Sequence, residues 1–356
     1  MKAEVIFVRA DRDEKIEAVR KKISGLFHKA DLGSCIQKKD LVAIKMHFGE
    51  KGNETSIPAS YVRPVVEEVM GRSGRPVLTD TCVLYRSVRD NAADHLRFAH
   101  DRGFTIENTG APVVIADGIH GSDEKTVRIP GRIFKEVSIA SAAAEADAMI
   151  VLSHVTGHMV TGLGGAIKNL GMGFSSRKGK LRQHATMKPG IARKFCTGCG
   201  VCIESCPEDA ISLVDDRAVI DGKTCIGCGE CLTVCRFDAV KHDWNRDSDD
   251  LQKRMAEHAL GVVIGKQNRT GYYNFILSVT KDCDCLPVRQ KPVIQDIGIL
   301  AGKDPVALDA ASLDLIQKHA GKPLSDSAYP QFDPWVQIRH GESIGLGTSE
   351  YRLIEL

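Results

Sequence analysis

The chain has 356 residues, of which 43% are hydrophobic and 26% are charged, and its formal net charge is +2. This length suggests two or three domains, and the composition is that of an ordinary globular protein. The charge predicts neither nucleic-acid nor membrane-surface binding, and no apolar run approaches the ~18 residues that a membrane span needs.

Strands alternate with helices through the first half of the chain. The apolar strands that the pattern predicts are residues 4–9, 41–47, 77–80, 113–117 and 148–154. The helices expected between them are residues 13–30, 58–71, 87–101 and 139–146. The next stretch, 155–194, is glycine-rich and then basic, and we expect it to be irregular.

The second half repeats this alternation less regularly. Helical spacing covers residues 248–261 and 305–319, and strands are expected near 273–280 and 293–300. Alternation of this kind favours parallel βαβ units, so we predict an α/β fold with a mostly parallel sheet and helices on both faces.

Eight cysteines repeat one spacing, Cys-x2-Cys-x2-Cys-x3-Cys, in two consecutive runs. The spacing is that of bacterial ferredoxins with two [4Fe–4S] clusters, in which the fourth cysteine of each run reaches the other cluster. The first cluster is therefore expected on Cys196, Cys199, Cys202 and Cys235. The second is expected on Cys225, Cys228, Cys231 and Cys206.

Other uses of these cysteines fit less well. Zinc ribbons need two CxxC pairs and not two triplets with trailing cysteines, and disulfide frameworks belong to small secreted chains. Because the chain also starts directly into a strand without signal-peptide features, we expect a reducing, cytoplasmic location. The second run has Arg236 where the first has Pro207, which places a positive charge beside one cluster.

The cysteine runs interrupt the α/β pattern. The simplest organisation is a core built from residues 1–189 and 243–356, with a ferredoxin-like module inserted at 190–242. A separate C-terminal domain is the alternative.

Polar residues gather at the predicted carboxyl ends of the strands, where α/β sheets bind their ligands. Candidates for catalysis are His47, Asp80, His154, His158 and Lys168. For each one taken alone, the alternative is an ordinary surface or capping residue.

A glycine loop follows His158. It matches neither a Walker loop nor GxGxxG, but glycines before a lysine can present backbone N–H groups to an anion. Candidates for cofactor binding are Gly162, Gly164, Gly165 and Asn169. If the segment is helical, His154 and His158 share a face and are suited to bind a metal. A glycine-rich turn with ordinary histidines is the alternative.

A second cysteine pair, Cys283-x-Cys285, lies outside the two runs. Such a pair either ligates a metal or cycles between thiol and disulfide. Two sulfurs cannot hold a [4Fe–4S] cluster alone, so further ligands would come from Cys82, Cys35 or the histidines. Buried, inert thiols are the alternative, and Cys35 is expected to be structural.

Over nearly its full length the chain resembles the "iron–sulfur center proteins" of domain-of-unknown-function family 362. The resemblance is carried by residues 45–50 (KMHFGE), 80–86 (DTCVLYR), 164–171 (GGAIKNLG), 282–285 (DCDC) and 296–305 (DIGILAGKDP). It implies a two-cluster module within an α/β core, but no settled reaction.

A short segment is also similar to the lactate racemase family, which uses a nickel pincer nucleotide. The similarity would match His158 to its base, Gly162 and Gly165 to its loop, Lys168 to its cofactor-bearing lysine and His184 to a metal ligand. This makes His184 a further cofactor-binding candidate, without carrying over the nickel cofactor.

Three functions are consistent with these features. The first is a redox protein in which two [4Fe–4S] clusters pass electrons to or from a second site at the strand ends, which would hold a substrate, a flavin, a nucleotide or a third metal centre. The second is a non-catalytic electron carrier or adaptor for a partner oxidoreductase. The third is metal or cluster delivery through Cys283 and Cys285. The expected partner is a redox protein or a small-molecule substrate.

Overall fold

The fold is known from a computed structural model that describes residues 2–184, 188–225, 227, 230–237, 239–241 and 248–356. Eight strands form one sheet, in the order β14-β1-β13-β12-β7-β2-β3-β4. Their bounds are β14 (Tyr351–Glu355), β1 (Ala3–Arg9), β13 (Gly298–Gly302), β12 (Thr270–Ile276), β7 (Ala148–His154), β2 (Leu41–Lys45), β3 (Arg75–Asp80) and β4 (Val113–Ile115). Within this sheet β13 runs antiparallel to both neighbours, and the other pairs are parallel. The predicted α/β fold with a mostly parallel sheet is confirmed.

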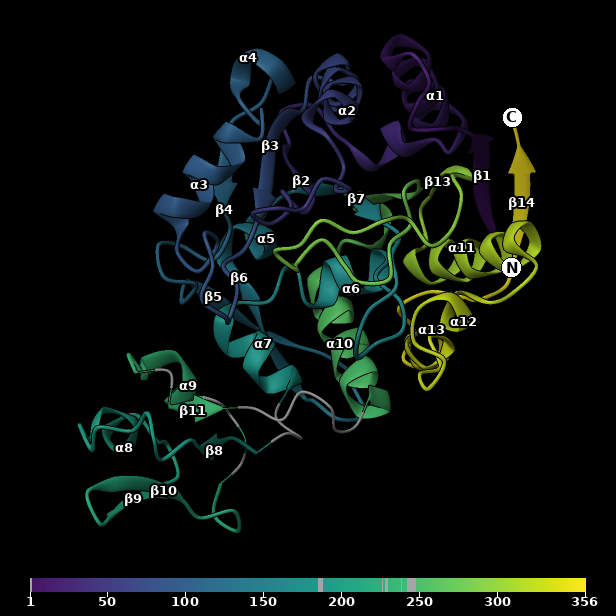
Figure 1. Ribbon diagram of the computed structural model, residues 1–356. Coiled ribbons are helices and arrows are strands. Elements are labelled where there is room, and N and C mark those ends of the chain that lie inside the picture. The colour runs from purple at the N-terminus through teal and green to yellow at the C-terminus, as the bar shows by residue number, and fades with distance from the viewer. Residues whose placement is uncertain (1, 185–187, 226, 228–229, 238, 242–247) are drawn as a thin grey trace.

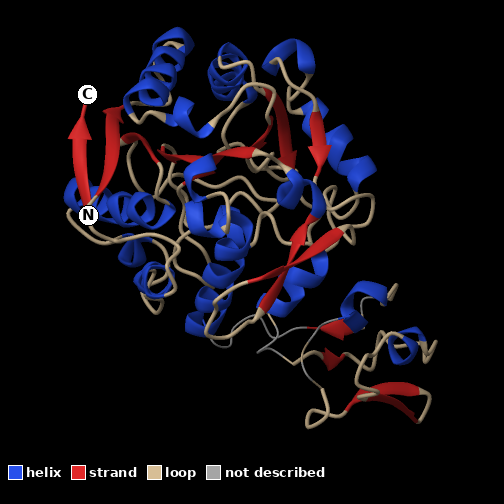
Figure 2. Ribbon diagram, turned by 180° about the vertical axis from the view of Figure 1, so that it is seen from behind, coloured by secondary structure: helices blue, strands red, loops and turns tan. Residues whose placement is uncertain are grey.

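The sheet is covered on both faces because its central strands are apolar on both sides. Along β7, Met149 and Val151 face one hydrophobic core, whereas Ile150 and Leu152 face the other. Figures 1 and 2 show helices on the two sides of the strands. One side holds α1 (Ile16–Lys29) and α2 (Ala59–Gly71), and the other holds α6 (Ala166–Gly171), α10 (Ser248–Val263), α11 (Pro305–Ala320) and α13 (Trp335–Ser343).

Smaller elements lie around this framework. They are the helices α3 (Ala92–Asp101), α4 (Ile106–Thr109), α5 (Ser141–Glu145) and α12 (Leu324–Ser327), the 3₁₀ turns at Leu32–Cys35 and Gln267–Arg269, and the hairpin of β5 (Glu124–Arg128) with β6 (Glu136–Ala140). The sequence pattern missed the hairpin, α12, α13 and β14. These elements are short or partly exposed, so their apolar periodicity is weak.

Two predicted boundaries were wrong. The stretch 155–194, expected to be irregular, contains α6 and α7 (Arg177–Gln183), and the side chain of Ser176 caps α7 by accepting from the amide of Gly179. The strand expected at 293–300 begins only at Gly298. The glycines and lysines of 155–194 concealed these two short helices.

Residues 190–241 form small elements between α7 and α10 in the chain (Figure 1). They are β8 (Gly190–Ile191), α8 (Val201–Glu204), β9 (Ile211–Val214), β10 (Arg217–Ile220), α9 (Glu230–Val234) and β11 (Val240–Lys241). β8 pairs with β11, and β9 pairs with β10, both antiparallel. Of the eight cysteines in the runs, Cys228 lies outside the described residues, as does residue 242 at the end of the predicted module. The helices that flank this segment pack together, and Arg254 of α10 donates to the carbonyl of Arg182 in α7 at 3.3 Å.

None of the helices within the described ranges combines the length and the apolar character needed to cross a lipid bilayer.

Candidate functional site

A cavity of ≈ 380 Å³ lies at the carboxyl ends of β2, β3 and β7. Its position agrees with the general location of ligand sites in parallel α/β sheets. The predicted site residues that line it are His47, Asp80, His154, His158, Gly164, Gly165, Lys168, Asn169, His184, Cys283 and Cys285. Gly162 is not part of the wall. The fold therefore brings together residues that are widely separated in the sequence.

One wall of the cavity is a buried network of charges. The ammonium of Lys45 lies 3.0 Å from Asp80, and the guanidinium of Arg89 lies 3.1 Å from Glu50 and 3.7 Å from Asp80. Burial acts to raise the pKa of Asp80, but Lys45 and the neighbouring cations hold that pKa below its ordinary value. Asp80 is thus a carboxylate that balances buried cations, and its Oδ2 has no hydrogen-bond partner among the described residues.

His154 is fixed by an ion pair with Asp284. Its Nδ1 lies 2.8 Å from Asp284 and its Nε2 lies 2.7 Å from the carbonyl of Leu277. Both ring nitrogens therefore face acceptors and are already used. The ring ends strand β7 and not a helix, so the helical pairing of His154 with His158 as metal ligands is wrong.

His47 and His158 have a different environment from His154. Nδ1 of His47 accepts from the amide of Gly49 at 2.9 Å, and Nδ1 of His158 accepts from Val160 and Thr161 at 3.2 and 3.0 Å. A ring that accepts at Nδ1 carries its proton on Nε2 when it is neutral. Burial lowers the pKa of both histidines well below the ordinary value. Each is therefore a neutral donor at Nε2.

Lys168 extends from α6 into the cavity wall. Within the described part of the chain, its ammonium has no hydrogen-bond or ion-pair partner. Burial lowers the pKa of Lys168 to about 8, with Asp284 acting in the opposite direction. It is a charged group without a counter-charge in contact.

Three amides at the glycine loop and the start of α6 already donate within the chain, so they are not open to an anion. The amides of Ala166 and Ile167 donate to the buried carboxylate of Asp309 at 2.7 and 2.9 Å, and the amide of Gly164 donates to the carbonyl of Thr156 at 2.9 Å. A Cβ on Gly165 would lie 2.4 Å from Asp309. The absence of a side chain at Gly165 therefore allows the carboxylate of Asp309 to approach and cap the start of α6.

The other cofactor-binding candidates have less direct roles. Asn169 accepts from Lys45 at 2.8 Å and donates to the carbonyl of Leu152 at 2.9 Å. Its side-chain amide thus links α6 to the strands β2 and β7. Gly162 adopts a φ of +67°, which favours glycine, and donates to the carbonyl of His158. His184 follows α7 and lies at the cavity wall.

Cys283 and Cys285 are joined by a disulfide that lines the cavity. A ring nitrogen of His158 and the two sulfurs all lie within 4.8 Å of one another. Cys82 and Cys35 are not part of this group; both are buried thiols, and burial raises the pKa of Cys82 to about 12. The pair thus has a histidine beside it, but no further cysteine among the described residues of the group.

Sequence reasoning gave no role to three residues of this site. Asp284 stands between the two cysteines and holds their turn by accepting from His154 and from Asn53, the latter at 3.2 Å. Arg89 lies between the carboxylates of Glu50 and Asp80. The hydroxyl of Thr156 lies close to Gly164. The alternation of acid and cysteine in DCDC is a signal by which Asp284 could have been found, whereas nothing local distinguishes Arg89 or Thr156 from ordinary loop residues.

The cysteine runs form a separate group. Cys196, Cys199, Cys202 and Cys235 line one small cavity, and this set contains three cysteines of the first run and the last of the second. Backbone amides donate to several of the sulfurs: Ala218 to Cys196 at 3.4 Å and Ala239 to Cys235 at 3.3 Å. These are the four cysteines that the spacing assigns to the first cluster, and their role as ligands stays a prediction.

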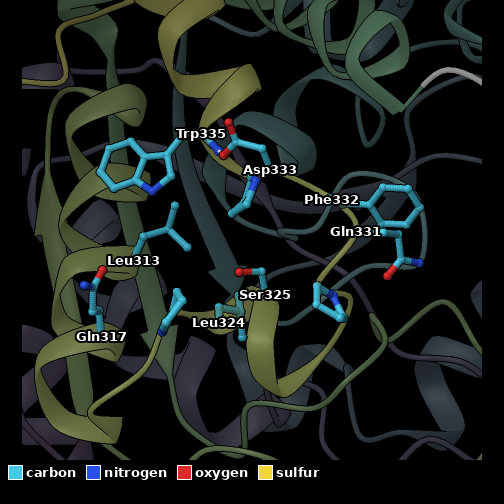
Figure 3. A pocket seen from close by; sticks show the side chains of 11 residues that line it. Leu313, Gln317, Leu324, Ser325, Gln331, Phe332, Asp333 and Trp335 are labelled. Atoms are coloured by element: carbon cyan, nitrogen blue, oxygen red, sulfur yellow. The ribbon is translucent and has the colours of Figure 1, made fainter.

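A further hollow of ≈ 300 Å³ lies between α11, α12 and the start of α13, where Figure 3 shows Trp335, Leu313 and Phe332 around it. Of the described residues in its wall, Asp333 alone is ionisable, and its carboxylate already accepts from Trp335 and pairs with Arg339. This hollow offers no group for chemistry.

Comparison with solved structures gives two similar chains. A crystal structure of a protein from Thermotoga maritima has a TM-score of 0.46 and 10% identity, over 88% of this chain and 60% of that one. The lactate racemase apoprotein from Thermoanaerobacterium thermosaccharolyticum has a TM-score of 0.41 and 14% identity, over 85% of this chain and 55% of that one. The chain thus spans only 55–60% of the length of these two proteins.

Comparison with curated proteins gives no match. The profile of one family, described as Domain of unknown function (DUF362), matches residues 42–314. This range contains the cavity wall, both cysteine runs and the Cys283–Cys285 pair. The chain therefore belongs to the DUF362 family.

Proposed function

We propose that this chain is an iron–sulfur redox protein, in which two [4Fe–4S] clusters exchange electrons with a second site in the cavity. The first cluster would be held by Cys196, Cys199, Cys202 and Cys235, and the second by Cys206, Cys225, Cys228 and Cys231. The observation that carries the proposal is that a cysteine pair lines the cavity, while the crossed set of four cysteines lines a separate small one. Such clusters supply single electrons at potentials that their surroundings set.

A loop after β3 supports electron exchange between the two groups. The guanidinium of Arg86 donates to the carbonyl of Arg236, the residue that follows Cys235. The adjacent Tyr85 donates from its hydroxyl to the carbonyl of Cys285 at 2.9 Å. Two neighbouring residues therefore contact the cysteine-run segment and the cavity pair.

The cavity residues suit a thiol–disulfide couple. Reduction of the Cys283–Cys285 disulfide breaks the S–S bond and consumes two electrons and two protons, giving two thiols. His158, with its proton on Nε2, and the ammonium of Lys168 provide donors that stabilise a developing thiolate. Asp284, fixed by His154, keeps the turn between the two cysteines in place when the bond opens.

The test is an anaerobic electron count on the full chain. Two clusters take up about 2 electrons per chain and a disulfide about 2 more, so the wild type should accept ~4 and the Cys283→Ser/Cys285→Ser variant ~2. Both should contain ~8 iron. The Cys82→Ser variant, which removes a buried thiol outside the cavity wall, is the control and should accept ~4. Equal uptake by wild type and double variant would favour the carrier or adaptor function.

A second candidate is metal or cluster delivery through the same pair. The closeness of His158 to both sulfurs favours it, because one imidazole and two thiolates are ligands that zinc or iron prefer. However, Nδ1 of His158 already accepts from two amides, so a metal at Nε2 would require removal of the remaining ring proton. A third metal centre would appear as iron above ~8 per chain that is lost in the double variant.

A further inference from the structure

The cavity wall contains three hydrogen-bond donors that lack acceptors among the described residues. Among the described residues, the ammonium of Lys168 and Nε2 of His158 contact no acceptor, and Oγ1 of Thr156 has no hydrogen-bond partner although Thr156 is only 1% exposed. A Cβ on Gly164 would lie 2.7 Å from Oγ1 of Thr156 and 3.9 Å from Cδ of Lys168. A side chain at this position would crowd Oγ1 of Thr156, and the stem of Lys168 lies beside the same position. His158 lies close to the two sulfurs of the Cys283–Cys285 pair in the same cavity wall.

The other cations of the wall are already neutralised or bonded. Lys45 pairs with Asp80 and Arg89 with Glu50. Lys180 donates to Thr81 and to the carbonyl of Ser175 at 2.7 and 2.6 Å. Lys168 is therefore the cation that a ligand can neutralise. Lys168 is partly buried, and a charge withdrawn from water without a partner has a desolvation cost, which a bound anion would reduce.

The rest of the cavity limits the kind of anion. The carboxylates of Asp80 and Asp284 lie in the same wall, so a dianion such as phosphate would be repelled more strongly than a monoanion. Much of the remaining wall is apolar, including Val83, Met159, Met172, Leu251 and Leu286. A volume of ≈ 380 Å³ accommodates a small metabolite and not a polymer.

We propose that the cavity binds a small organic monocarboxylate with an apolar body. Its carboxylate would accept from Lys168, Thr156 and His158, and its body would lie against the apolar wall beside the Cys283–Cys285 disulfide. A Cβ on Gly164 would also lie 3.9 Å from Cβ of Cys283, which puts the carboxylate end close to the disulfide. The inference names the substrate class of the redox site and so rests on the proposed function.

The test is calorimetric titration of the full chain with octanoate, butyrate and phenylacetate, each compared with its own amide. The amides keep the shape but lose the charge, so at least one acid should bind about tenfold more tightly than its amide. The Lys168→Met variant should lose this preference, Lys168→Arg should keep part of it, and Thr156→Val should weaken it by a smaller factor. Lys303→Met, which removes a surface lysine paired with Asp31, is the matched control and should bind as the wild type does.

Several results would overturn the inference. They are equal binding of acids and amides, unchanged acid binding by a Lys168→Met protein that unfolds cooperatively, or inorganic phosphate binding more tightly than every acid. Repeating the titration on the Cys283→Ser/Cys285→Ser variant separates the two proposals. Acid binding that persists there, together with equal electron uptake by wild type and double variant, would reject the redox function and keep the carboxylate site. Reduction of the disulfide without any preference for acids over amides would reject the carboxylate site and keep the redox function.

Discussion

The cysteine-run segment and the main cavity place their functional groups in opposite ways. In residues 190–241, three of the four cysteines around the small cavity lie within one run, and the fourth comes from the neighbouring run. In the cavity, His47, Asp80, Lys168 and Cys283 come from four distant parts of the chain. His47 and Asp80 lie at the carboxyl ends of β2 and β3, Lys168 lies on α6, and Cys283 lies in the loop after β12. The comparison teaches that spacing can predict which side chains come together where the backbone between them is short. Where the backbone between them is long, the sheet topology must be known.

The largest expected effect concerns crossed ligation in the cysteine runs. If Cys235 serves the first cluster, Cys196→Ala and Cys235→Ala should each lower iron from ~8 to ~4 per chain, and so should the double variant. Cys196→Ala with Cys206→Ala should instead remove nearly all iron, because it damages both clusters. The measurement is iron and acid-labile sulfide on protein purified without oxygen. Complete loss in the Cys196/Cys235 double variant and retention in the Cys196/Cys206 one would mean that the runs bind separately.

Removal of the central carboxylate of the cavity should destabilise the fold. Asp80→Asn leaves Lys45 and Arg89 buried with less negative charge, and we expect a loss of about 3–5 kcal/mol in the free energy of unfolding. Urea unfolding of the full chain measures it. Asp101→Asn, on the exposed face of α3, is the control, with a change within about 0.5 kcal/mol. Similar values for both variants would show that the wall tolerates unpaired cations.

The internal cap of α6 gives a smaller test of the same long-range assembly. In Gly165→Ala the new Cβ would collide with Asp309, at a cost of about 1–3 kcal/mol. Gly25→Ala in α1 is the matched control, because nothing lies within 4 Å of a Cβ there, and it should stabilise the protein by about 0.5–1 kcal/mol. Thermal unfolding distinguishes them. A stabilising Gly165→Ala would mean that Asp309 does not approach this glycine.

The smallest effect depends on pH. Lys168 has a pKa lowered to about 8 from its ordinary value of 10.5, so between these values the folded chain binds fewer protons than the unfolded chain. Stability of the wild type therefore gains with rising pH in this window, relative to a variant without the lysine. Lys168→Met should be more stable by about 1–3 kcal/mol below pH 8, and the difference should shrink towards pH 10.5. A difference that is constant across the window would place the ammonium in water.

The sequence predicts the α/β class well because parallel strands such as Ala148–His154 are continuous apolar runs. It also predicts that His47, Asp80 and Lys168 lie near one edge, since polar residues follow those strands. Arg89 and Asp309 could not be predicted, because each acts through a partner far away in the chain and resembles a surface residue locally. The β5–β6 hairpin was not predicted for a different reason. β5 is partly exposed, so its sequence has little apolar alternation.

The packing of α7 against α10 across the cysteine-run segment has a consequence for damage and repair. The segment leaves and returns through two helices that already pack together, and the entropy of closing a loop grows only with the logarithm of its length. The core therefore needs few contacts with the segment to hold its two ends together. If the segment holds the clusters proposed above, their destruction by oxygen would therefore leave the core folded, with the loss of its Arg86–Arg236 hydrogen bond. Such a protein could be reloaded in place, without having to be made again.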